Sequence, residues 1–414
     1  MTSDNPLFTL DADQVDYLRE GRELGTGALS EFAARDEQAV YEHQGGSGVE
    51  NGDGDPLSVY VRTPFWADVD RIINNPFFTR TYDKTQVFSL YRNDNITRRG
   101  FHIQLVAQTA MKIGSALRLN VPLIQAIGLG HDAGHTPFGH AGEHFLSEIY
   151  SARTGRFFNH NVHSVRALRS VAPCNLSLQS YNGMVCHCGE NNFAKYSTSP
   201  CETFADLDAM LEACYLEKGR SSCLRPSTLE GCVVRISDIL AYLGKDRQDA
   251  IETGILRSEA YYLDSFLGRN NAEIIRNATA NIVKNSIERN AIVMDEEVSD
   301  EIRRLKSGNY VEIYSYDNAE KTLSNIVKPM MEEVYARLAN DLAQGREDSP
   351  IFTEHLNAWF IETRNPSYRE DNTDDDIVVD YIASMTDDYF IALYRHLFPS
   401  DPKAQLDLYH PYFE

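Results

Sequence analysis

The sequence predicts an all-α fold, a helical bundle core with additional C-terminal helices, and three observations support this class. Apolar residues recur at helical spacing over long segments, most clearly at 102–119 and 229–243. Segments that alternate apolar and polar residues, as half-buried strands do, are few and short. No internal repeat or low-complexity domain divides the chain. We therefore expect helices packed around a large core.

The first 170 residues are expected to form a short N-terminal helix, a linker and a series of further helices. The segment 43–55, HQGGSGVENGDGD, is Gly-rich and acidic, which favours a flexible connection. Pro122 opens a helical segment at a position that tolerates proline. Within 102–119, the apolar residues share one face of a helix: Ile103, Val106, Ala107, Ala110, Ile113 and Leu117.

The rest of the chain combines a polar insertion with more helices. Residues 189–228 are irregular, with one helix expected at about 204–217. A long helix begins near residue 229, and a last helix is expected over 378–398. The predicted organisation is an N-terminal helix with the Gly-rich acidic segment at 1–60, a central helical domain with the insertion at 61–270, and a C-terminal helical region packed on it at 271–414.

The charge of the chain narrows the classes of partner. A formal net charge of −22 disfavours nucleic acid as the main partner, because binding to phosphate backbones needs clustered Lys and Arg. An anionic small substrate stays compatible, since a metal ion or a few cations can offset charge locally. The N-terminus shows no basic start followed by an apolar run, and no segment approaches the roughly 18 apolar residues of a membrane span. We expect a cytoplasmic enzyme or binding protein without a membrane partner.

All seven cysteines fall between Cys174 and Cys232. An odd number of cysteines without a secretory signal argues against a disulfide framework. The sequence Cys-His-Cys at 186–188 suggests zinc, but its spacing is not the usual one, and no second matching pair follows. Reduced, mostly structural cysteines are the simpler interpretation, with a metal or redox role as the alternative.

The segment 128–145, GLGHDAGHTPFGHAGEHF, holds four of the twelve histidines. His131 and Asp132 end an apolar helix, and neighbouring imidazole and carboxylate groups are suitable ligands for a divalent metal. If a helix restarts near residue 139, His140, Glu143 and His144 lie on one side of it. A His-Asp pair is a weak signal by itself, because capping and turn chemistry also place polar residues in such a loop.

Other ligands would have to come from distant segments. His102 begins one helix, and Asp238 lies in the helix that begins near 229. That second helix carries an apolar stripe and, beside it, a polar stripe at steps of three and four residues: Arg235, Asp238, Tyr242, Asp246 and Asp249. The polar stripe is either the wall of a site or a solvated charged face, and the helix alone favours the solvated face.

Taken together, these motifs resemble a known family. His102, His131-Asp132 and Asp238 resemble the H…HD…D arrangement of HD-domain metal phosphohydrolases. HDAGHTPFGHAGEHF is very similar to the signature of the dGTPase-like deoxynucleoside triphosphate triphosphohydrolases. Further matches follow in the same order: RTPFWADVDRIINNPFFTRTYDKTQVF at 62–88, FNHNVHSVRAL at 158–168, EGCVVRISDILAYLGKD at 230–246 and VVDYIASMTDDY at 378–389.

The resemblance implies a role for each matching residue. His102, His131, Asp132 and Asp238 would hold one divalent ion, Mn²⁺ or Mg²⁺ first, with Fe²⁺, Co²⁺, Ni²⁺ or Zn²⁺ as alternatives. The acid/base residues would be His140 with Glu143, and His160 nearby. The substrate contacts would be Gln86 on the deoxyribose, Arg99 on the phosphates, and His135, Tyr242 and Asp246. The charge of a triphosphate also makes Lys84 and Lys245 suitable companions of Arg99. The resemblance also implies a homo-oligomer, from dimer to hexamer.

The implied function is metal-dependent hydrolysis of deoxynucleoside triphosphates to deoxynucleoside and tripolyphosphate, by attack of water at the α-phosphate. Three departures leave the substrate open. Lys245 stands where many members of the family carry histidine. VCHCGENNFAKYS replaces a basic stretch of the family, and RRGFH replaces its R-L-T-H run. The alternatives are a nucleotide monophosphatase or phosphodiesterase on the same fold, and an effector-gated nucleotide-sensing regulatory protein.

Overall fold

The computed structural model of the chain describes residues 5–24, 29–43, 62–189, 194–257, 264–314 and 321–411. The predicted all-α class is confirmed in this part of the chain, where helices account for nearly all regular structure. The strands described are β1 (Lys195–Tyr196) and β2 (Ile292–Val293), which pair antiparallel. Beyond His43, the expected flexible connection at 43–55 lies outside the described residues.

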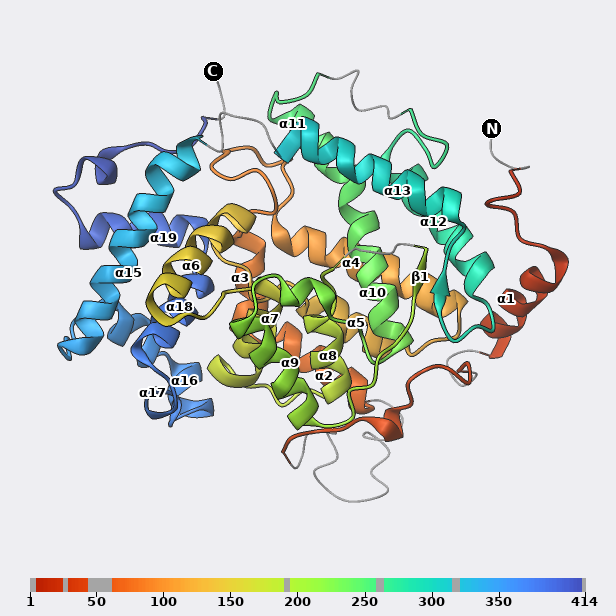
Figure 1. Cartoon of the computed structure of the whole chain (residues 1–414), viewed down its shortest axis with the longest axis horizontal. Coiled ribbons are helices and arrows are strands. Elements are labelled where there is room, and N and C mark those ends of the chain that lie inside the picture. The colour runs from red at the N-terminus through yellow and green to blue at the C-terminus, as the bar shows by residue number, and fades with distance from the viewer. Residues whose placement is uncertain are drawn as a thin grey trace.

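The centre of the fold is a group of packed helices: α2 (Pro64–Ile73), α4 (Arg99–Ala116), α5 (Val121–Gly130), α8 (Leu178–Val185) and α10 (Leu229–Leu243). α4 packs against α5 and α10, and α5 also contacts α2 and α8. These helices cross the middle of the molecule in Figure 1. The apolar face expected on the segment 102–119 is buried in this core, as Ile103 and Ile113 show.

The other helices surround this centre, joined by short 3-10 and π-helical turns. They are α1 (Ala12–Leu24), α3 (Pro76–Arg80), α6 (Gly139–Thr154), α7 (His160–Arg166), α9 (Phe204–Leu216), α11 (Lys245–Glu252), α12 (Asn271–Ser286), α13 (Glu296–Asn309), α15 (Lys328–Ala343), α16 (Trp359–Arg364), α17 (Tyr368–Asp371), α18 (Asp374–Ser384) and α19 (Asp387–Leu397). The expected helix inside the polar insertion is α9, and the expected restart near residue 139 is α6.

One expected helix is wrong. The segment 378–398 forms parts of two helices, because α18 ends at Ser384 and α19 begins at Asp387. Met385 has extended backbone angles, and the Thr386 side chain caps α19 by accepting a hydrogen bond from the Tyr389 backbone N–H. A threonine N-cap satisfies an N–H that a helix start would otherwise leave unpaired, so the break is locally stable.

The C-terminal helices lie beside α6, where α15 and α18 both contact it (Figure 1). Buried carboxylates connect the two regions. Asp380 on α18 accepts hydrogen bonds from Arg166 Nε at 2.6 Å and from the Tyr368 hydroxyl at 2.6 Å. Asp387 accepts a hydrogen bond from the Phe138 backbone N–H at 3.0 Å. The C-terminal region therefore holds the loop that precedes α6.

No helix in the described residues combines the length and the apolar character that crossing a lipid bilayer requires.

Gly134 makes the closest backbone approach near that loop. A Cβ atom at this position would lie 2.1 Å from the Ser164 backbone nitrogen and 2.3 Å from the His163 carbonyl carbon, both in α7. We expect Gly134→Ala to destabilise the protein by about 3 kcal/mol, because the backbone of α7 must move away. Urea unfolding followed by far-UV circular dichroism measures this change.

Gly155→Ala is the matched control. Gly155 has a left-handed backbone conformation, with φ of +76°, but no atom lies within 4 Å of its added Cβ. Only the left-handed conformation is penalised there, at about 1 kcal/mol. Equal losses of stability in the two variants would contradict the steric account of Gly134.

Candidate active site and metal centre

The packing of α4, α5 and α10 brings His102, the pair His131-Asp132 and Asp238 together. His102 lies in the first turn of α4, His131 directly follows the last residue of α5, and Asp238 lies in the middle of α10. His102 Nε2 is 2.9 Å from Asp238 Oδ1. His131 Nε2 is 3.6 Å from Asp132 Oδ1 and 4.0 Å from Asp238 Oδ1. Ligand atoms of one ion stand about 3–4 Å apart when each bond is about 2 Å long, so this spacing suits a metal site.

The His131 imidazole is prepared for a ligand. Its Nδ1 lies 2.7 Å from the Gly128 carbonyl oxygen, which only accepts, so Nδ1 carries the proton. Nε2 is then an acceptor, and it is buried with no hydrogen-bond partner. A buried polar atom without a partner is costly, and a divalent ion would satisfy it. The donor set therefore fits a divalent metal ion.

The Asp132 carboxylate is buried, and it is surrounded by imidazoles and by the guanidinium group of Arg99. Oδ1 is 3.6 Å from the Nε2 atoms of both His135 and His187, and Oδ2 accepts a hydrogen bond from Arg99 Nη1. Burial alone would raise the pKa of Asp132, but the nearby imidazoles and Arg99 hold it well below its usual range. Asp132 is therefore ionised and able to act as a ligand.

A second group of side chains centres on Glu143 in α6. Its carboxylate is 2.9 Å from His160 Nδ1 and 3.2 Å from His140 Nδ1, and it accepts a hydrogen bond from the His160 backbone N–H at 2.8 Å. Burial opposes charge on these groups, but the attraction between Glu143 and the imidazoles lowers the pKa of Glu143 and raises that of His160. The His140 side chain is 72% exposed, so it faces the solvent side of this group.

Three of the expected substrate contacts border these groups. The His135 ring stacks on the His160 ring, with 3.9 Å between centroids. Gln86 is buried, and its Oε1 atom has no hydrogen-bond partner. Arg99 donates to the Gln86 carbonyl oxygen at 3.2 Å as well as to Asp132. The arrangement thus offers one acceptor, Gln86 Oε1, and one cation, Arg99, beside the metal ligands.

The other expected contacts are engaged within the protein. Lys84 is fully buried and donates hydrogen bonds to the carbonyl oxygens of His135 and Ala383, so it supports the loop from beneath. Asp246 accepts a hydrogen bond from the Tyr314 hydroxyl, and burial raises the pKa of Asp246 to about 7. Tyr242 lies near enough to Asp238 and Asp246 that both add to the rise in its pKa caused by burial. Lys245 pairs with Asp249 at 2.7 Å.

The prediction that the polar stripe of α10 forms a solvated face is wrong. Arg235 is buried, and so are Asp246 and Asp249 just beyond the helix end. Arg235 donates hydrogen bonds to backbone carbonyl oxygens, including that of Cys186 at 3.2 Å. The stripe therefore faces protein, and Asp238 on it reaches the metal group.

Sequence reasoning missed His187. It lies just beyond α8, and its Nδ1 is 2.6 Å from the Met184 carbonyl oxygen, so Nδ1 carries the proton and Nε2 faces Asp132. Burial lowers the pKa of His187 to about 3, which keeps the imidazole neutral. The signal in the sequence is the histidine of Cys-His-Cys at 186–188, which stands between two cysteines of unusual spacing for a zinc site.

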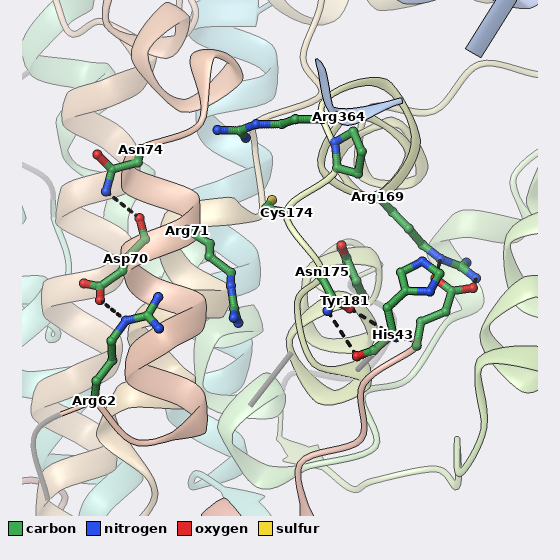
Figure 2. A pocket seen from close by; sticks show the side chains of 12 residues that line it. His43, Arg62, Asp70, Arg71, Asn74, Arg169, Cys174, Asn175, Tyr181 and Arg364 are labelled. Atoms are coloured by element: carbon green, nitrogen blue, oxygen red, sulfur yellow. Dashed lines mark hydrogen bonds and ion pairs between the residues drawn. The ribbon is translucent and has the colours of Figure 1, made fainter. Parts of the chain in front are cut away.

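A separate cavity of about 590 Å³ lies away from these groups, and none of its lining residues belongs to the expected site. Figure 2 shows arginines on both of its walls, among them Arg62, Arg169 and Arg364. Arg62 pairs with Asp70 at 2.9 Å, and Arg169 pairs with Glu42 at 2.7 Å. The arginine charge there is partly neutralised. Because all the expected site residues lie elsewhere, this cavity is not the candidate active site.

Comparison with known proteins gives consistent matches. Residues 99–243 match the HD domain, and residues 292–396 match the phosphohydrolase-associated domain. A deoxyguanosinetriphosphate triphosphohydrolase-like protein of Desulfatibacillum aliphaticivorans is 30% identical over 83% of this chain and 89% of its own length. One of Caldanaerobacter subterraneus is 29% identical over 84% and 89%. A solved phosphohydrolase of Bacteroides thetaiotaomicron, 15% identical, covers 80% of this chain and 69% of its own with a TM-score of 0.39, too low to support an argument.

The proposed metal ligands His102, His131, Asp132 and Asp238 can be tested by substitution. We expect His102→Ala to weaken Mn²⁺ binding at least about tenfold, because it removes one donor and leaves Asp238 without its hydrogen-bond partner. Electron paramagnetic resonance of free Mn²⁺ during titration of metal-stripped protein measures the dissociation constant. His144→Ala is the control, since His144 is exposed and pairs with Glu148. Equal affinities in the two variants would contradict the assignment.

Proposed function

Because the chain belongs to the deoxyguanosinetriphosphate triphosphohydrolase-like family of HD-domain phosphohydrolases, we propose that it hydrolyses deoxynucleoside triphosphates to deoxynucleoside and tripolyphosphate. Membership makes it a hydrolase with an HD phosphohydrolase domain, and the deoxynucleotide substrate is the proposed part. One observation carries the proposal: two groups of side chains meet at the buried carboxylate of Asp132. The first is the set of candidate metal ligands, and the second is the group centred on Glu143, whose His160 lies close to Asp132. The predicted domain boundaries and the homo-oligomer stay predictions.

HD-domain phosphohydrolases are metal-dependent, and the proposed ligands are His102, His131, Asp132 and Asp238. The ion would neutralise phosphoryl oxygens and orient a water molecule for attack at the α-phosphorus. Its identity stays open among Mn²⁺, Mg²⁺ and the other divalent ions named above. The chain's own contribution is to hold these four donors close together, His102 and Asp238 on the helices α4 and α10 and His131 and Asp132 in the turn after α5.

The proton for the leaving group is proposed to come from His140. The leaving 5′-oxygen of the deoxynucleoside needs a proton, and an imidazole held by a carboxylate can supply it. Glu143 accepts from His140 Nδ1, which leaves Nε2 free to donate toward the substrate. His140 is also the most exposed side chain of this group, so a substrate entering from solvent meets it first.

Gln86, Arg99 and His135 are proposed to bind the substrate. The unpaired Gln86 Oε1 atom can accept a hydrogen bond from a deoxyribose hydroxyl. Arg99 donates a hydrogen bond to Asp132. Its guanidinium group could donate to the phosphates instead once a metal ion neutralises that carboxylate. Tyr242, Asp246 and Lys84 are proposed as supports of this surface. Asp246 and Lys84 make hydrogen bonds inside the protein, and Tyr242 lies close to Asp238 and Asp246.

Product analysis tests the proposed reaction. Purified protein with Mn²⁺ or Mg²⁺ is incubated with each of the four deoxynucleoside triphosphates, singly and mixed, and with deoxynucleoside monophosphates. Phosphorus NMR then separates tripolyphosphate from orthophosphate and diphosphate. Intact tripolyphosphate is the expected product. Orthophosphate from the monophosphates alone would favour the monophosphatase alternative instead.

The proposed proton donor has a specific prediction. His140→Ala is expected to lower kcat by about 10²–10⁴ while leaving the Mn²⁺ dissociation constant unchanged. His144→Ala is the matched control, because His144 lies one turn further along α6 and is similarly exposed. If both variants retain full kcat, His140 is not the donor.

A further inference from the structure

Three donor atoms lie together beside the first metal group and have no part in the proposed reaction as a set. His160 Nε2 and His187 Nε2 are 3.3 Å apart, and each is 3.2 Å from Cys188 Sγ. His160 begins α7, whereas His187 and Cys188 follow α8, so helix packing and not sequence proximity brings them together. Both imidazoles are buried, and the cysteine is half-buried.

A fourth donor completes the set. Asp132 Oδ1 is 3.6 Å from His187 Nε2 and 3.9 Å from His160 Nε2. Around a tetrahedral ion with bonds of about 2.0–2.3 Å, neighbouring ligand atoms stand about 3.3–3.8 Å apart. The observed separations lie close to this range before any ion draws the donors together.

The imidazoles are oriented for ligation. His187 Nδ1 donates to the Met184 carbonyl oxygen, and His160 Nδ1 pairs with Glu143 at 2.9 Å. A histidine ligand commonly uses its second nitrogen in this way, because the outer hydrogen bond fixes the ring and the tautomer. In both residues the nitrogen left over is Nε2, and both Nε2 atoms point at Cys188 and Asp132.

Cys188 differs from its neighbours in the cysteine-rich segment. All seven cysteines are free, as expected without a disulfide framework. Cys186, two residues earlier, turns into the apolar core, where its sulfur contacts Met210 Sδ at 3.8 Å. Among the described residues, Cys188 is the cysteine that joins a group of possible metal ligands. Cys188 is therefore set apart from the other six cysteines, for which a reduced, structural role is the simpler interpretation.

We propose that His160, His187, Cys188 and Asp132 form a second metal site, which shares Asp132 with the first and whose thiolate selects Zn²⁺ or Co²⁺ over Mg²⁺ and Mn²⁺. Binding converts the Cys188 thiol to a thiolate and releases its proton to solvent. The proposal rests on Asp132 being a ligand but not on the identity of the substrate.

The second site also divides the roles of the two histidines that share Glu143. A metal-bound His160 has no free nitrogen for proton transfer, because Nδ1 faces Glu143 and Nε2 faces the ion. His140 then remains as the imidazole on Glu143 that can exchange a proton. The alternative is a hydrogen-bonded cluster without an ion, in which His160 donates to His187 or Cys188.

Cobalt spectroscopy on the full-length, metal-stripped protein distinguishes these possibilities. Bound Co²⁺ reports a thiolate ligand through a sulfur-to-metal charge-transfer band in the near ultraviolet. We expect titration to load about two Co²⁺ per chain, with a charge-transfer intensity equal to one thiolate. Cys188→Ser should remove the band and one equivalent of Co²⁺, while His102→Ala should keep the band and weaken the other equivalent.

The controls make each outcome decisive. Cys223→Ser removes an exposed cysteine and should leave both the band and the stoichiometry unchanged. Far-UV circular dichroism confirms that each variant is folded, and His187→Ala provides a second variant, expected to reduce the band without removing a sulfur. A band that survives in Cys188→Ser, or a wild-type protein without a band, would overturn the second site. Neither result depends on whether deoxynucleoside triphosphates are hydrolysed, so the two proposals can fail separately.

Discussion

The buried carboxylate of Asp132 is the point on which the arrangement of the site depends. Its Oδ1 atom lies within 4 Å of imidazole nitrogens from four histidines, and its Oδ2 atom pairs with Arg99. Removing a carboxylate from water costs several kcal/mol unless charges and hydrogen bonds compensate for it. The compensating groups come from α4, the end of α5, α7 and the end of α8. The positions of these helices and the charge of Asp132 therefore support one another.

Much of the helical framework could be predicted from local sequence, because apolar periodicity is a property of neighbouring residues. The segments that became α4, α5 and α9 show this, and so does the restart at Gly139. Two expectations failed, the first for a local reason and the second for a reason that is not local. The Thr386 cap breaks a segment whose apolar content looked continuous. The polar stripe of α10 is buried because distant backbone carbonyls accept hydrogen bonds from Arg235.

The candidate site, like the fold, was predictable from the sequence only in part. His131 and Asp132 stand out in the sequence. His102 and Asp238 were candidates from distant helices, and the resemblance to a family assigned them the role of ligands. The structure brings all four together. Their roles stay predictions, as do those of His140, Glu143 and His160. The place of His187 could not be read from the sequence, because 55 residues separate it from Asp132 and only the packing of α8 brings its Nε2 within 3.6 Å. Lys84 was expected to face the phosphates, and its buried hydrogen bonds to carbonyl oxygens could not be anticipated from its charge.

Those hydrogen bonds have a consequence for the integrity of the chain. The Lys84 Nζ atom is enclosed between the carbonyl oxygen of His135, in the loop that precedes α6, and that of Ala383 in α18, some 300 residues away in sequence. Beside it, Asp387 joins Thr85 to the start of α6. A shortened protein that ended before α18 would leave the buried Lys84 amino group without one of its two acceptors, and an unsatisfied buried donor is costly. The motif-bearing half is thus no detachable module, and recombination between relatives can exchange either half only if these few contacts are inherited together.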